Sequence, residues 1–143
     1  MNRNEILKEV LEWDGTKWQH QQAKKQVACD CAGFVRGVYA NLGGPQIELM
    51  DYPATWHLFK HEERMYEVCK QYLKEIPVAE AKVGDILLFA YRERFVAHHI
   101  GILLNNGKFM HADQDAGVVH QTKLDSVWKG RIRAAFRFRE LVD

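Results

Sequence analysis

Apolar residues recur at helical spacing in several parts of the chain. After Asp30 they lie on one helical face, at Phe34, Val35, Val38, Tyr39 and Leu42. Gly43-Gly44-Pro45 ends this pattern abruptly. A first helix is predicted over roughly residues 5–13, with one apolar side formed by Ile6, Leu7, Val10 and Leu11. A further helix, capped by Thr55 and followed by Pro77, is predicted from Trp56, Phe59, Tyr66, Cys69 and Leu73. We expect the first helix to pack against the body of the protein and Cys69 to lie in the core.

Strand patterns dominate the second half of the chain. They predict one strand over residues 83–91 and a second, rich in branched side chains, over residues 96–104. Near the end, apolar residues at Ile132, Ala134, Phe136 and Phe138 alternate with Arg131, Arg133, Arg137 and Arg139. This alternation predicts a last strand with one buried face and one basic, solvated face. The segment from Pro45 to Ala54 is predicted to be a mobile loop.

The turn after the second strand decides which histidines share a face of the sheet. A two-residue turn at Asn106-Gly107 places His99 and His111 on opposite faces. A three-residue loop over residues 105–107, with Gly107 in the left-handed conformation, instead pairs Gly101 with His111 and makes the two rings diagonal neighbours. Because side chains alternate along a strand, His98 and His99 face opposite ways. We therefore expect one of these two histidines to meet the helix that begins after Asp30.

Cys31 stands at the start of that helix, in the first turn. Asp30 is its predicted N-cap, since a side-chain oxygen there satisfies an otherwise unpaired amide of the first turn. A helix N-terminus or a neighbouring imidazolium lowers the pKa of a thiol and favours the nucleophilic thiolate. The backbone N–H of Cys31 is then available to an oxyanion. The alternative is a buried cysteine that fills core space.

Length and composition indicate one domain over residues 1–143, since 47% of the residues are hydrophobic and no linker or repeat interrupts the chain. A formal charge of +1 gives no basis for nucleic acid or membrane binding. The three cysteines are expected to stay reduced. A metal site built from Cys29, Cys31, His98, His99 and His111 is an alternative, but paired ligands such as Cys-x2-Cys are absent from the sequence. We therefore expect neither a metal nor another cofactor.

Four motifs, in order, resemble the NlpC/P60 cysteine peptidases. They are residues 30–35 (DCAGFV), 84–89 (GDILLF), 99–102 (HIGI) and 107–112 (GKFMHA). The resemblance implies a papain-like α+β fold, in which the cysteine helix packs on a central antiparallel sheet. It also implies that Cys31 is the nucleophile, His99 the general base and His111 the residue that orients the base. Asp113 is the rival for the last role, because the register above places it opposite His99.

The same resemblance implies a substrate, namely the stem peptides of bacterial peptidoglycan, cleaved where D-glutamate is joined through its γ-carboxyl to a diamino acid. One departure concerns the oxyanion hole, since relatives often place a tyrosine where this chain has Trp18. The indole N–H of Trp18, or the side chain of Gln19 or His20, is a candidate replacement donor. Two alternatives stay open at this point. In the first, the chain is a non-catalytic tail or wall-binding module. In the second, it is a thiol-dependent amidase or acyltransferase that acts on another γ-glutamyl amide.

Within the family, the chain most resembles the branch found in phage tail-assembly and gene-transfer clusters. The features that carry this likeness are residues 13–21 (WDGTKWQHQ), the Cys-Asp-Cys triplet and the closing pattern of Leu124, Trp128, Arg131 and residues 135–138 (AFRF). The start of the chain lacks the apolar core of a secretory signal, so we expect synthesis in the cytoplasm. Release by lysis or transport in a phage particle is then expected, with phage or prophage tail proteins as partners.

Overall fold

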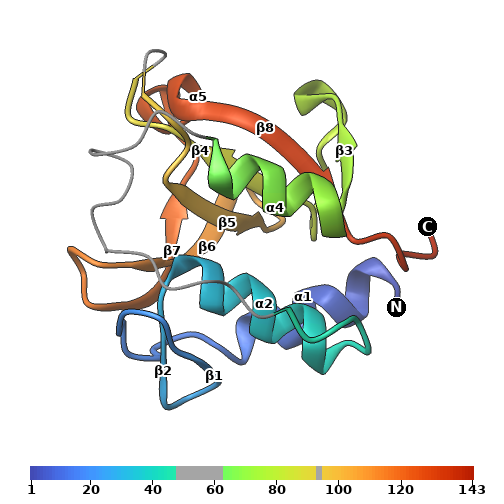
Figure 1. Ribbon diagram of the computed structural model, residues 1–143, viewed down its shortest axis with the longest axis vertical. Coiled ribbons are helices and arrows are strands. Elements are labelled where there is room, and N and C mark those ends of the chain that lie inside the picture. Colours follow the sequence, from blue (N-terminus) through green and yellow to red (C-terminus); the bar gives the residue numbers. More distant parts are fainter. Residues whose placement is uncertain (48–62, 93–94) are drawn as a thin grey trace.

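A six-stranded antiparallel sheet lies at the centre of the computed structural model, which describes residues 1–47, 63–92 and 95–143 (Figure 1). The strand order is β3-β8-β4-β5-β6-β7. The bounds are β3 Lys74–Ile76, β4 Ile86–Phe89, β5 His99–Leu103, β6 Lys108–Asp113, β7 Val118–Lys123 and β8 Ile132–Arg137. The predicted α+β class with a central antiparallel sheet is confirmed. The first two predicted strands are shorter than their sequence patterns.

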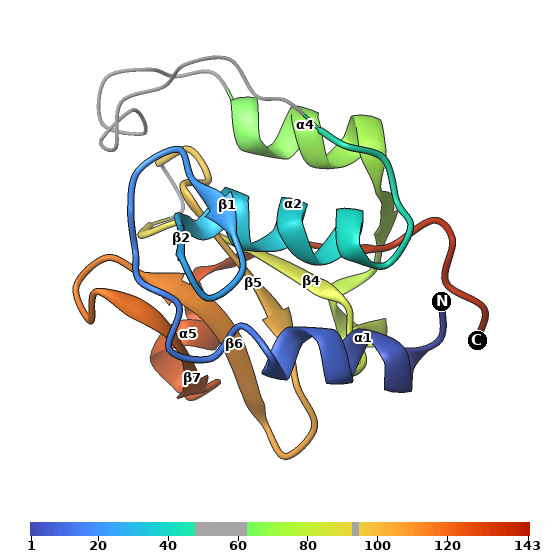
Figure 2. The same cartoon turned by 90° about the horizontal axis from the view of Figure 1, so that it is seen from below.

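Helices cover one face of this sheet. They are α1 Arg3–Leu11, α2 Cys31–Asn41 and α4 Arg64–Tyr72, and Figure 2 shows them one above another, with α2 between α4 and α1. The short helix α5, Ser126–Arg131, lies on the other side, and η1, Val78–Glu80, leads from β3 toward β4. A two-stranded ribbon of β1, Ala23–Lys24, and β2, Ala28–Cys29, precedes α2. Among the described residues, no helix has the length and apolar character needed to span a membrane.

The core has two parts because the middle of the sheet is buried on both faces. The larger cluster joins α1, α2 and α4 to the sheet through residues such as Ile6, Phe34, Cys69 and Phe136. The smaller cluster lies on the opposite face and consists of Ile76, Leu87, Phe89, Phe109 and Ala135, with Trp128 of α5 packed against it. All four residues of β4 are therefore buried, which its continuous apolar run favours.

The predicted solvated face of the last strand is wrong. Ala135 of β8 is buried in the smaller cluster. Arg133 is ion-paired with Glu63, and Arg137 is ion-paired with Asp85, whose side chain is fully buried. The physical reason is that both faces of the sheet are covered at β8: the larger cluster packs on Ala134 and Phe136, and the smaller cluster, which includes Ala135 and packs against Trp128, covers the other face.

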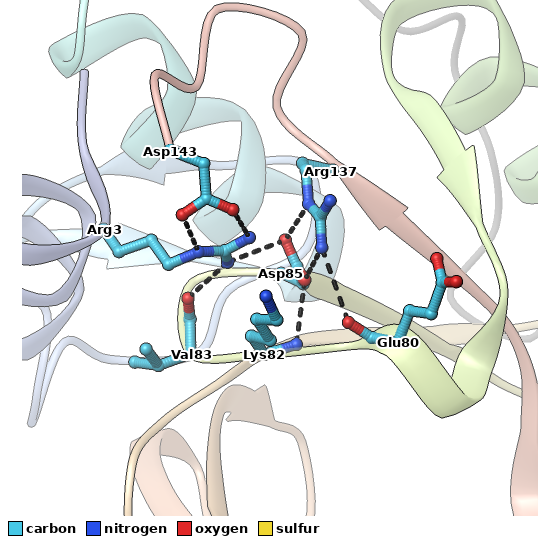
Figure 3. A network of polar contacts seen from close by, with 7 residues as sticks. All are labelled: Arg3, Glu80, Lys82, Val83, Asp85, Arg137 and Asp143. Atoms are coloured by element: carbon cyan, nitrogen blue, oxygen red, sulfur yellow. Dashed lines mark hydrogen bonds and ion pairs between the residues drawn. The ribbon is translucent and has the colours of Figure 1, made fainter.

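A polar network ties the two chain ends to the sheet (Figure 3). The carboxylate of Asp85 accepts hydrogen bonds from Arg137 Nε at 3.0 Å, Arg137 Nη2 at 2.9 Å and Arg3 Nη1 at 3.2 Å. Arg3 also donates to Asp143 at 2.9 and 3.0 Å. The backbone N–H of Val142 donates to the Met1 carbonyl, so the N- and C-terminal ends of the described chain lie side by side.

The helices follow their sequence patterns with local differences. Helix α1 begins earlier than predicted, after Asn2 as N-cap, and Leu11 is 43% exposed, whereas Ile6 and Val10 are fully buried. The burial of Cys69 in the core is confirmed. Helix α4 starts after Glu63, while Thr55, Trp56 and Phe59, predicted at its start, and residues 48–54 of the predicted loop lie outside the described residues.

Candidate active site

Asp30 fixes the start of α2 and so the place of Cys31. Its side chain accepts a hydrogen bond from Gly33 N at 2.7 Å and another from Gln21 N at 2.8 Å, and Asp30 is 3% exposed. The predicted N-cap is confirmed. A Cβ at Gly33 would lie 1.8 Å from the carbonyl oxygen of Gln22, so this close approach of loop and helix requires glycine. The carboxylate of Asp30 thus joins the 19–22 loop to the first turn of α2.

The sulfur of Cys31 lies beside the backbone of His99. Its Sγ is 3.9 Å from the carbonyl oxygen of His98, and backbone hydrogen bonds from Ala32 and Ile100 favour its thiolate. The groups at 98 and 100 flank His99 on either side. The start of β5 therefore meets the start of α2, although the thiol is hydrogen-bonded to a carbonyl and not to an imidazole.

The electrostatic setting of Cys31 differs from that expected for a helix N-terminus. Burial, followed by the negative charge of Asp30, raises the pKa of the Cys31 thiol to about 12. These two effects outweigh the backbone N–H groups that favour the thiolate. At neutral pH we therefore expect a neutral thiol in the resting protein.

His99 and His111 meet on one face of the sheet. His99 Nε2 lies 2.7 Å from His111 Nδ1, and the ring centroids are 4.9 Å apart. The strands β5 and β6 pair Ile102 with Met110 and Leu103 with Phe109, as the three-residue loop predicts. Gly107 has a φ of +73°, and Asn106, with a φ of 66°, also adopts the left-handed conformation. The predicted contact between these two rings is confirmed.

Both imidazoles are neutral at neutral pH. Burial, and then the positive charge that His111 and His98 would carry, hold the pKa of His99 well below its usual range. Burial lowers the pKa of His111 to about 4. Each ring therefore carries a single N–H, so the hydrogen bond between them has a direction.

Thr122 is the site residue that the sequence analysis missed. Its hydroxyl oxygen lies 2.7 Å from His111 Nε2, so His111 contacts His99 through one nitrogen and Thr122 through the other. Strands β6 and β7 pair His111 with His120 and Phe109 with Thr122. Extending the hairpin argument from β5–β6 to β6–β7 is the step that finds it, because His120 and Thr122 share one face of β7.

Asp113, the rival to His111, makes a different contact. Its carboxylate lies 2.9 Å from His120 Nε2, and the His120 ring stacks on His111 with centroids 5.1 Å apart. The ring contact to His99 comes from His111. Asp113 and His120 thus flank the contact between His99 and His111.

Aromatic rings enclose the histidines on the side away from the three long helices. Trp128 of α5 contacts His99 and His111, with centroids 6.0 and 5.4 Å away. Tyr91 stacks on His98 with ring centroids 4.1 Å apart, and the His98 ring lies 6.3 Å from that of His99. The guanidinium of Arg131 lies over both Trp128 and Tyr91, at 5.0 and 5.5 Å from the ring centroids.

The loop before β2 carries the predicted oxyanion donors. The backbone of Trp18 forms a bridge with Cys29, and Gln19 N donates to the Cys29 carbonyl at 3.0 Å. Trp18 and His20 are each half-buried. This pairing brings their loop alongside the strand that leads into Cys31.

The structure brings together a set of possible metal ligands that differs from the set suggested by the sequence. Within the described part of the chain, the group close enough to share an ion is His111, Asp113 and His120, with ligand atoms within 4.8 Å of one another. It contains no cysteine. Both ring nitrogens of His111 already lie 2.7 Å from polar partners, so an ion there would displace one of them. Cys29 is fully buried.

Comparison with known proteins identifies a family and a shared fold. The model of the NlpC/P60 family matches residues 11–137. The chain is 24% identical over 135 residues to the Escherichia coli (strain K12) protein named murein DD-endopeptidase MepS/murein LD-carboxypeptidase, covering 94% of this chain and 62% of that protein. The chain therefore spans less than two thirds of this relative's length.

Two solved structures illustrate the shared fold. The NlpC/p60 domain of the peptidoglycan hydrolase SagA has a TM-score of 0.66 at 21% identity, covering 96% of this chain and 100% of that one. RipD from Mycobacterium tuberculosis, described as a non-catalytic NlpC/p60 domain protein adapted to peptidoglycan binding, has a TM-score of 0.61 at 14% identity, covering 94% and 95%. At these low identities, the two likenesses show a common fold and nothing about activity.

Proposed function

The chain belongs to the NlpC/P60 family, and from this membership and the geometry of its site we propose that it is a cysteine peptidase of bacterial peptidoglycan. The substrate is the stem peptide, cleaved at the bond between D-glutamate, through its γ-carboxyl, and a diamino acid. The observation that carries the proposal is the meeting of Cys31, at the start of α2, with the strand that presents His99 to His111.

The proposed reaction follows the thiol–imidazole template. His99 takes the Cys31 proton as the sulfur attacks the amide carbonyl, and then delivers it to the departing amine. Because burial raises the thiol pKa and lowers that of His99, proton transfer accompanies attack and no stable thiolate precedes it. Water, activated by His99, then hydrolyses the thioester.

The negative charge that develops on the amide carbonyl oxygen during attack must be stabilised by hydrogen-bond donors near the start of α2. We assign the backbone N–H of Cys31 as one donor, since the first amides of a helix have no partner within it. A side chain of the 18–20 loop, Trp18 or His20, is the proposed second donor, because that loop pairs with Cys29. Asp30 contributes by fixing the first turn.

Purified stem peptides of several diamino-acid types, incubated with the protein and resolved by mass spectrometry, test this function. We expect cleavage at the D-glutamyl bond by the unaltered protein. Replacement by Cys31→Ala or His99→Ala should lower turnover by about 10³-fold or more, as losses within a catalytic unit do. Cys69→Ala is the matched control, since it removes a core thiol away from the site and should retain activity.

A second candidate, a non-catalytic wall-binding module, is favoured by one observation. The Cys31 thiol is held strongly protonated, and the fold is shared with a protein described as non-catalytic. Intact peptides together with sedimentation of the folded protein on isolated walls would select this candidate. An added amine acceptor in the same assay separates hydrolysis from acyl transfer, because transfer yields an amine adduct.

We also propose a phage or prophage tail as the carrier of the protein, with delivery to the wall inside a particle or by lysis. The support is the resemblance of residues 13–21 and of the Cys-Asp-Cys triplet to the phage-type branch. Co-sedimentation of the protein with assembled tails, but not with tail-less particles, is the expected result. Its uniform recovery in unbound fractions would contradict this carrier.

A further inference from the structure

The contacts of His111 continue beyond the residues assigned so far. Its Nδ1 faces His99 and its Nε2 faces the Thr122 hydroxyl, each at 2.7 Å. His111 is 1% exposed, so water has little access to Nε2. A buried imidazole N–H without an acceptor is costly, and the partner of this nitrogen therefore influences which ring nitrogen holds the proton.

Two proton arrangements satisfy the contact between the rings. In the first, His99 donates from Nε2 to Nδ1 of His111, and the lone pair of His99 lies on Nδ1. In the second, His111 donates from Nδ1, and His99 carries its proton on Nδ1. Only the first arrangement leaves His99 able to accept a proton at Nδ1, the nitrogen that His111 does not contact.

Proton transfer from Cys31 selects between them. Once protonated, His99 is an imidazolium and donates from both nitrogens. His111 must then accept at Nδ1 and carry its own proton on Nε2. That Nε2–H points at the oxygen of Thr122, which can accept it through a lone pair. In the second arrangement the same hydroxyl would instead donate to the unprotonated Nε2, so it is the imidazolium form of His99 that requires Thr122 as an acceptor.

We propose that Thr122 is a positioning residue, which accepts the Nε2–H of His111 and thereby holds His99 in the tautomer that acts as a base. The assignment of a base role to His99 rests on the proposed function. The tautomers themselves are a property of the resting protein. Thr122 touches neither the sulfur nor the substrate in this scheme and acts through His111.

Nitrogen-15 NMR of protein labelled at histidine tests the tautomers directly. In the unaltered protein we expect His99 and His111 each to carry the proton on Nε2. Thr122→Val removes the acceptor and keeps the side-chain shape, so the population should shift toward protons on Nδ1 of both rings. Thr122→Ser restores the hydroxyl and should restore the original tautomers. A proton on Nδ1 of His99 in the unaltered protein overturns the proposal without any variant.

Reactivity gives a second readout. Thr122→Val should slow alkylation of Cys31 by iodoacetamide, and should lower kcat on stem peptides, by about 10- to 100-fold with KM little changed, since a buried donor is left unpaired. Thr122→Ser should stay within about threefold of the unaltered protein. The matched control is Gln121→Val, at the adjacent exposed position of the same strand, which should change neither rate.

The two readouts separate this inference from the proposed function. If stem peptides stay intact with the unaltered protein, the peptidase proposal fails, while the tautomers and the alkylation rates still decide the role of Thr122. Unchanged tautomers and unchanged alkylation in folded Thr122→Val would overturn that role even if the peptides are cleaved.

Discussion

At the scale of single residues, the site holds its reactive groups in their neutral forms. Burial favours the neutral form of both groups, because it raises the pKa of the Cys31 thiol and lowers the pKa of the His99 imidazole. The helix N-terminus alone predicts the opposite for the thiol. The difference arises first from burial of the sulfur and then from Asp30, whose carboxylate caps the helix and also places a negative charge beside the sulfur.

Asp30→Asn separates these two effects of the carboxylate. The amide oxygen still caps Gly33 N, whereas the negative charge and the hydrogen bond from Gln21 N are lost. We expect the pKa of Cys31 to fall from about 12 and alkylation by iodoacetamide at pH 8 to rise by about 10-fold. Asp30→Ala is the control for the cap and should also lose about 1 kcal/mol of stability. Slower alkylation by folded Asp30→Asn would contradict this account of the charge.

His111 predicts a pH dependence of stability. Its pKa is about 4 in the folded protein against 6.5 for the ordinary group, so between these values the unfolded chain binds more protons. Stability is therefore full above pH 6.5 and falls as pH decreases toward 4, by about 2 kcal/mol between pH 7 and 5 from this group. Urea denaturation across that range measures it. His111→Gln should flatten the slope, and an unchanged slope would assign it to other groups.

At the scale of elements, the sequence predicts best where local chemistry determines the geometry. The Asp30 cap and the loop at residues 105–107 depend on a few neighbouring residues, and both were predicted correctly. The exposure of β8 was predicted wrongly, because it depends on the residues, distant in sequence, that pack on the second face of the sheet. Thr122 was missed for a similar reason, because its place beside His111 requires the pairing of β6 with β7.

At the scale of the whole molecule, Asp85 joins distant parts of the chain. It ends the turn that leads into β4, pairs with Arg137 of β8 and contacts Arg3 of α1, which in turn pairs with Asp143. The two guanidinium groups and the Lys82 N–H leave the fully buried carboxylate well satisfied. Asp85 precedes β4, whereas His99 pairs with Phe89 at the other end of that strand. We therefore assign the buried charge of Asp85 a role in the fold.

Asp85→Asn tests how much this network stabilises the molecule. Removing one partner of a buried ion pair leaves the other charges uncompensated, so we expect a loss of about 3–5 kcal/mol in the free energy of unfolding, measured with urea. Asp143→Asn is the matched control, because it removes a carboxylate from the same Arg3 at a side chain that is 49% exposed. Such a solvent-exposed pair contributes little to stability, so we expect a much smaller loss than in Asp85→Asn. Equal losses in the two variants would mean that the burial of Asp85 does not determine how much the network stabilises the protein. The predicted larger loss in Asp85→Asn would assign most of that stabilisation to the one buried carboxylate.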